Sequence, residues 1–279
     1  ALERDKRLKG TNAIPISVQR MAWVFLKQGH LHKVMELTKK YDKYVRQRGV
    51  RGYYIAGVQN LLMGEIYLEW NQLEEAEKQI SEGLRLIKDW PNPAIVMIGY
   101  CLLTRLHIAK NNLSDAEVTF MNIEELLFSN QFHPEFVNIL EQTQLQLWIE
   151  TKKRLALESF VSTKSPLVSL PLTFRNEAVL IGLSRAWLAL GEFDKARSLL
   201  TRLAAFTKGR KGSHLLILLM LVNAHKEQTD LAEKYLEEAL HLAEPEGYIR
   251  TFLNIGEPLW KLLKNWFTKN QNTSDEVLK

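Results

Sequence analysis

The sequence predicts an all-α protein in which about six antiparallel helix pairs stack as a right-handed superhelical solenoid, followed by a terminal helix. Three observations predict this fold. Apolar residues recur every three to four positions, as at Leu180, Leu183, Trp187 and Leu190, which is the period of an amphipathic helix. Val, Ile and Thr do not alternate with polar residues over any convincing stretch, so strands are not expected. A short pattern returns about every 40 residues.

The recurring pattern is Gly or Asn, any residue, Leu or Phe, two residues, and then a small apolar residue. Its four clear copies begin at Gly29, Asn71, Asn111 and Gly191. Because the last interval is 80 residues, a hidden junction is predicted at Thr151, with Ala156 as its small residue. A looser copy begins at Thr229. Gly and Asn adopt the positive φ of a tight turn readily, and the small residue allows the second helix to approach the first closely.

Gly and Pro lie between the apolar runs and so mark the ends of the elements. The helix pairs are predicted at 14–46, 53–88, 93–128, 134–162, 173–206 and 213–243, with a terminal helix at 257–269. Connections longer than a minimal turn are predicted at 46–52, 162–173 and 208–212. Pro166 and Pro171 must interrupt the helix in the second of these connections. This irregular fourth repeat either bends or caps the array, or holds an inserted ligand site.

The composition of the chain excludes several classes of protein. The 279 residues carry a formal net charge of +5, and 46% of them are hydrophobic, as in ordinary globular proteins. The longest apolar stretch, 215–222, is too short to span a bilayer. The single cysteine, Cys101, excludes a disulfide framework and a Cys-rich zinc site. A charged N-terminus without a secretory signal predicts a cytoplasmic piece of a longer protein.

No set of residues indicates catalysis. Residues 209–213 contain the letters of a phosphate-binding loop without its spacing, and no Gly-x-Ser-x-Gly motif occurs. His30 and His32 are interpreted as exposed histidines, because a metal would need more ligands. Basic clusters at 46–51, 152–154 and 208–211 are interpreted as solvated loops rather than phosphate contacts. We therefore expect no enzyme activity, no cofactor and no metal in this chain.

Helix pairs of this kind resemble tetratricopeptide (TPR) repeats, whose first helices line a concave face. In the TPR unit, the position six before the junction reaches that face. In this sequence the positions are Trp23, Glu65, Arg105, Leu145, Arg185 and Asn223. One interpretation is a solvated helix face. The other is a recognition strip, in which Trp23 stacks on a ligand while Glu65, Arg105, Arg185 and Asn223 supply charge and hydrogen bonds.

The segment 242–259 reads Leu-Ala-Glu-Pro-Glu-Gly-Tyr-Ile-Arg-Thr-Phe-Leu-Asn-Ile-Gly-Glu-Pro-Leu. It resembles the end of the superhelical region of MalT-like, LuxR-type transcriptional activators, where a similar stretch closes a TPR-like array. Thr251, Asn254 and Ile255 depart from that pattern, at a bend. The upstream repeats fit the same region, so the resemblance covers nearly the whole chain. It implies one superhelical domain over 1–279, with a terminal bend at 244–258.

The resemblance also implies a function. Full-length members carry a nucleotide-binding module before the array and a DNA-binding helix-turn-helix after it, and neither is in this chain. The chain is then an effector-sensing domain that binds a small-molecule inducer or a regulatory protein on its concave face. The implied partners are the activator's other domains and further copies of itself, but neither DNA nor membrane.

A generic TPR scaffold that binds a peptide or a protein segment is the alternative function. The strip contains only one Asn, which favours a small effector over an extended peptide. Whether the connection at 162–173 covers a ligand site is left open by the sequence.

Overall fold

The computed structural model describes residues 13–46, 49–89, 92–129, 132–225 and 227–270. Within these ranges it contains 14 α-helices, two 3-10 helices and no strand, so the prediction of an all-α, TPR-like solenoid is confirmed. Contacts divide the chain into two compact units, 1–157 and 158–279, and each is described by itself. A single domain with a right-handed superhelical path stays a prediction. None of the described helices is long and apolar enough to cross a membrane.

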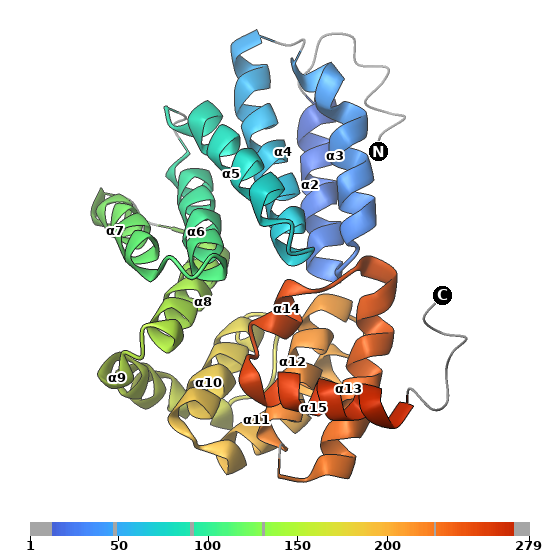
Figure 1. Ribbon diagram of the computed structural model, residues 1–279. Helices are drawn as coiled ribbons and strands as arrows, with labels where there is room; N and C mark the ends of the chain where they lie inside the picture. The colour runs from blue at the N-terminus through green and yellow to red at the C-terminus, as the bar shows by residue number, and fades with distance from the viewer. Residues whose placement is uncertain (1–12, 47–48, 90–91, 130–131, 226, 271–279) are drawn as a thin grey trace. The chain divides into compact units, whose positions relative to one another are not determined.

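The first unit consists of helix pairs stacked in chain order (Figure 1). Its helices are α2 (Ala13–Gln28), α3 (Leu31–Arg46), α4 (Gly49–Glu69), α5 (Leu73–Ile87), α6 (Pro93–Ala109), α7 (Leu113–Ser129) and α8 (Pro134–Glu150), and α9 (Arg154–Lys164) begins in it. Within this unit α2 packs on α3, α4 on α5, and α6 on α7. In addition, α4 packs on α2 and α6, and α6 packs on α8. The first helices of successive pairs therefore lie side by side, as in a stacked repeat.

The second unit holds two further pairs and the terminal elements. These are η1 (Ser165–Ser169), α10 (Glu177–Leu190), α11 (Phe193–Thr207), α12 (Lys211–Ala224), α13 (Thr229–Ala243), η2 (Glu244–Glu246), α14 (Arg250–Leu253) and α15 (Glu257–Asn270). Helix α12 packs on α10, α11, α13 and α15. A helix with neighbours on most sides needs an apolar surface all round, and α12 buries nine of its 14 residues.

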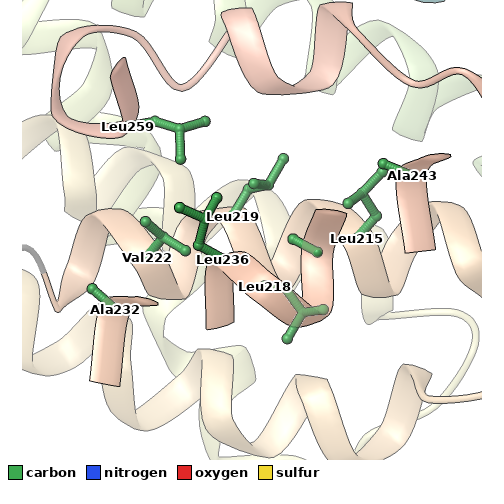
Figure 2. Packing of buried hydrophobic residues seen from close by; sticks show 9 residues of the cluster. Leu215, Leu218, Leu219, Val222, Ala232, Leu236, Ala243 and Leu259 are labelled. Carbon is green, nitrogen blue, oxygen red and sulfur yellow. The ribbon is translucent and has the colours of Figure 1, made fainter. Parts of the chain in front are cut away.

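Buried side chains of α12, α13 and α15 form the core at the end of the array (Figure 2). Leu219 and Val222 of α12 and Leu236 of α13 meet Leu259, which projects from α15 and is 1% exposed. Trp266 also packs against this core, and its indole N–H donates a hydrogen bond to Glu237. These contacts fix the terminal helix on the last pair.

Four turns lie where the repeated pattern predicts them. The residues with positive φ are Gly29 (81°), Asn71 (58°), Asn111 (61°) and Gly191 (82°). At the second turn, the Asn71 N–H donates to the Leu68 carbonyl and the Gln72 N–H donates to the Tyr67 carbonyl, at 3.1 and 2.8 Å. The other three turns contain the same pair of bonds, which satisfy the last carbonyls of the helix.

The prediction of the fourth junction at Thr151 is wrong by one residue. The left-handed residue is Lys152 (φ 55°), whereas Thr151 caps α8 with a φ of −86°. Leu157, which is 4% exposed, occupies the buried position predicted for Ala156. The distance from the third turn at Asn111 to this turn is therefore 41 residues rather than 40. All repeat positions counted from the fourth turn shift by one residue towards the C-terminus.

This shift places two leucines where the first and second helices of a pair meet. In the other repeats the equivalent pairs are Ala22 with Val34, Gly64 with Ala76, Thr104 with Ala116, and Ser184 with Ala196. In the fourth repeat they are Leu145 and Leu157, at 0% and 4% exposed. Two leucines need more room than two small residues, so α8 and α9 cannot approach as closely as the other pairs.

The connections predicted at 46–52 and 208–212 are shorter than predicted, because α4 begins at Gly49 and α12 begins at Lys211. The connection predicted at 162–173 lies a few residues later, at 165–176, because α9 extends to Lys164 and α10 begins at Glu177. Residues 47–48 lie outside the described part. The segment with the two prolines is held by hydrogen bonds from Arg202 of α11 to the Val168 carbonyl, at 3.0 Å, and from Asn176 to the Pro171 carbonyl, at 2.9 Å. At 244–258 the chain bends twice, at Gly247 (φ 72°) and Gly256 (φ 82°).

Candidate functional site

The first helices position most of the predicted strip. Trp23 lies on α2, Glu65 on α4 and Arg105 on α6 in the first unit, and Arg185 lies on α10 in the second. Each of the four stands six residues before a residue with positive φ, and each is partly exposed. They therefore share one position of the repeat, as the sequence predicts.

Two predicted members change once the turns are known. With the fourth turn at Lys152, the residue six positions before the turn is Gln146 (6% exposed) rather than Leu145. The one aliphatic residue of the predicted strip is thus replaced by a polar residue. In the last pair no described turn residue fixes the register, so we count back from the buried Ala232 of α13: the row residues stand eleven before the equivalent buried residue of their own pairs, and the equivalent position here is the buried Leu221. Asn223 is therefore two residues out of register and does not belong to the row. Trp23, Glu65, Arg105 and Gln146 lie in the first unit, and we call them the first-helix row. Arg185 occupies the same repeat position in the second unit.

Two members of the first-helix row bind each other. The guanidinium of Arg105 lies 3.2 Å from the carboxylate of Glu65, across the contact between α4 and α6. Their side chains are 26% and 24% exposed, so the pair is half-buried and less screened by solvent than a surface pair. The two charges link neighbouring repeats and leave a polar, nearly neutral surface at this point of the row.

A buried thiol lies one turn before Arg105. Cys101 is 1% exposed, and burial raises the pKa of its thiol to about 12, although a hydrogen bond with Thr143 and the charge of Arg105 oppose the rise. Glu65 adds to the rise. The thiolate is the reactive form of cysteine, so this thiol stays neutral and unreactive in the folded chain.

We expect Cys101 to react with a thiol reagent such as Ellman's reagent only as fast as the first unit unfolds. Its burial and raised pKa both remove the reactive thiolate at about pH 8. Labelling kinetics of the native chain, compared with the chain in denaturant, measure this directly. Because Cys101 is the only cysteine, rapid labelling of the native chain would contradict its placement at this contact.

A cavity of about 390 Å³ opens at the end of the array. It is lined by Val222, Glu227, Thr229, Glu257, Lys261, Leu262 and Asn265. Glu257 and Lys261 form an ion pair of 2.8 Å with side chains 75% and 71% exposed, and the hydrogen bond with Lys261 lowers the pKa of Glu257. These walls face water rather than enclosing a ligand, and no residue of the first-helix row contributes to them.

Among the described residues, no group of three His, Cys, Asp or Glu side chains is arranged to hold a metal ion. In the first-helix row, the Glu65–Arg105 ion pair and the indole ring of Trp23 are partly exposed, whereas the amide of Gln146 is buried. Such a set can bind and orient a polar ligand, which makes the row a candidate recognition surface.

Residues 3–269 match the protein family described as "MalT-like TPR region". The chain belongs to the MalT-like TPR family. The HTH-type transcriptional regulator MalT of Yersinia pestis (strain Pestoides F) is 24% identical over 271 residues, which cover 92% of this chain and 29% of the relative. MalT of Serratia proteamaculans (strain 568) is 24% identical over 256 residues, which cover 88% of this chain and 28% of the relative.

This MalT-like TPR region spans less than a third of the length of these relatives. The relatives are transcriptional regulators, and the family to which this chain belongs is their TPR region. The bend at 244–258 and the repeats carry the resemblance that the sequence indicates. The sequence predicts Leu145 rather than Gln146 at this position because Lys152 is neither Gly nor Asn. The signal for the shift is Ile149, which continues the aliphatic column of Leu26, Leu68, Ile108 and Leu188, whereas Trp148 would interrupt it.

Proposed function

We propose that this MalT-like TPR region is the effector-sensing domain of a cytoplasmic bacterial transcriptional activator. It has no catalytic role, and it binds a small-molecule inducer or a regulatory protein on the first-helix row. Its further partners are the activator's other domains and other copies of itself, and it does not contact DNA or membrane. The observation that carries the proposal is a polar row at one repeat position within a family of transcriptional regulators.

An effector can change the activity of a regulator only through a difference in affinity between two states. The Glu65–Arg105 pair is suited to such a difference, because it joins two repeats and is half-buried. A ligand group that binds Arg105 competes with Glu65 and so changes the contact between α4 and α6. Binding would thus be coupled to the packing of successive repeats.

A TPR scaffold for an extended peptide is the second candidate. A peptide would need several side-chain amides along the row, and Gln146 is its only amide once Asn223 is excluded. This composition favours the small effector or a folded regulatory protein over an extended peptide.

Thermal-shift measurements with sugars, amino acids, nucleotides and short peptides test the proposal, because a ligand that binds only the folded state raises the midpoint. For a ligand found in this way, we expect Arg105→Ala to weaken binding by about tenfold or more. Arg85→Ala removes an arginine outside the row and should leave the affinity unchanged. Equal binding by these two variants would exclude the row as the site, and Arg185→Ala tests separately whether the second unit binds a ligand.

The exchange Glu65→Arg plus Arg105→Glu separates recognition from structure. The attraction between α4 and α6 remains in this variant, so its midpoint without ligand should stay close to that of the natural chain. The positive charge, however, now lies on α4 and the negative charge on α6, so a ligand that recognises Arg105 on α6 should bind more weakly. A variant that is stable and still binds normally would show that the pair is purely structural.

A further inference from the structure

Two apolar side chains lie in the middle of the solvent-facing side of α7. Val118 and Met121 are 60% and 61% exposed, and they are three residues apart, so they lie on the same face of the helix. The opposite face, with Ala116, Phe120 and Ile123, is buried against neighbouring helices. Single exposed apolar residues are common on protein surfaces, so the significance of this pair depends on comparison with equivalent positions.

The other repeats supply that comparison. In each second helix, one buried residue donates its N–H to the carbonyl four residues earlier at the turn, and Ala116 is this residue in α7. Val118 and Met121 are two and five residues after it. The equivalent residues are Glu36 and Lys39 in α3, Lys78 and Ser81 in α5, Ser159 and Ser162 in α9, Ser198 and Thr201 in α11, and Lys234 and Glu237 in α13. All ten are polar and exposed, so among these six helices only α7 exposes an apolar pair at this position.

The charge of α7 is also unlike that of the whole chain. The helix contains Asp115, Glu117, Glu124 and Glu125 and no basic residue, although the chain carries +5. Glu117 is paired with Lys153 at 2.6 Å. The other three carboxylates are exposed, and each is three or four residues from Val118 or Met121. Two α7 helices facing each other would bring carboxylates together, which opposes symmetric self-association through this face.

We propose that the outer face of α7, formed by Asp115, Val118, Met121, Glu124 and Glu125, binds a cationic amphipathic helix of another protein. The apolar stripe of that helix would cover Val118 and Met121, and its Lys or Arg side chains would pair with the flanking carboxylates. This face is distinct from the first-helix row, because α7 is the second helix of its pair. The proposal does not depend on the proposed function.

The probe is a synthetic amphipathic helix of leucine and lysine with a fluorescent label, and fluorescence anisotropy measures its binding to the chain. We expect binding that weakens as salt is raised. The variant Val118→Ser plus Met121→Thr introduces the residues that α11 carries at these positions and leaves the charge unchanged. It should weaken binding by about tenfold, as should Glu124→Gln plus Glu125→Gln. Because all four side chains are exposed, these variants should unfold at the temperature of the natural chain.

The reverse exchange is the matched control. Ser198→Val plus Thr201→Met gives α11 the apolar pair, but α11 carries Lys195, Arg197 and Arg202 against a single Asp194, so it should not gain affinity for the lysine helix. A helix of leucine and glutamate should not bind α7. Unchanged binding by the Ser/Thr variant, or equal binding of the leucine–glutamate helix, would overturn the proposal. So would a dimer of the natural chain that the Ser/Thr variant abolishes, because the occupant would then be a second copy.

Discussion

Replacing Gly57 by valine is expected to lower the free energy of unfolding of the first unit by about 3 kcal/mol. A Cβ atom at Gly57 would overlap Cγ2 of Ile87 and would lie 3.0 Å from the backbone oxygen of Gly83. A Cβ at Gly83 would likewise lie 3.0 Å from the oxygen of Gly57. The two glycines thus allow the backbones of α4 and α5 to touch. Side chains can rotate away from a new methyl group, but the backbone oxygen cannot move without separating the helices.

Chemical denaturation followed by circular dichroism measures this loss. The control is Gly209→Val, since no atom lies within 4 Å of a Cβ built at Gly209 and the stability should barely change. A Gly57→Val variant as stable as the natural chain would mean that α4 and α5 do not pack at this distance.

The second large effect is expected for Leu236→Ala, at about 3 kcal/mol. Leu236 is 0% exposed and lies between Leu219 and Val222 of α12 and Leu259 of α15 (Figure 2). Removing its side chain leaves a cavity between three helices that are each held by other contacts, so the cavity cannot close completely. The loss should also loosen α15, which Leu259 fixes on this core.

Leu170→Ala is the matched control, because the same atoms are removed from a side chain that is 48% exposed. Its denaturation midpoint should change by less than a third of the shift that Leu236→Ala causes. Similar shifts for the two variants would show that the cluster of α12, α13 and α15 does not form the core of the second unit.

The helices and four of the turns are predictable from the sequence, because their signals are local. Gly29, Asn71, Asn111 and Gly191 are residues that adopt positive φ readily, and the structure has positive φ at all four. The fourth turn could not be found in this way, since Lys152 is a residue that rarely adopts this conformation. The signal that remains there is the aliphatic column of the first helices, which continues at Ile149.

The candidate site was only partly predictable, for a related reason. The repeat spacing places Glu65 and Arg105 at the same repeat position, and the structure adds that they bind each other. The same spacing misplaces Asn223, because α12 ends at His225 without a Gly or Asn turn in the described residues. Val118 and Met121 form an apolar pair at positions of the second helix that are polar in the other repeats, a signal that the turn pattern alone does not contain.

The five described turns at Gly29, Asn71, Asn111, Lys152 and Gly191 are each closed by two backbone hydrogen bonds, whether the left-handed residue is Gly, Asn or Lys. The shape of each of these turns therefore depends on main-chain atoms that every amino acid except proline possesses. Substitutions can then change the left-handed residue, and most residues around it, without disrupting the turn between the two helices. This tolerance is in keeping with an architecture that survives when three of every four residues differ between this chain and its Yersinia relative.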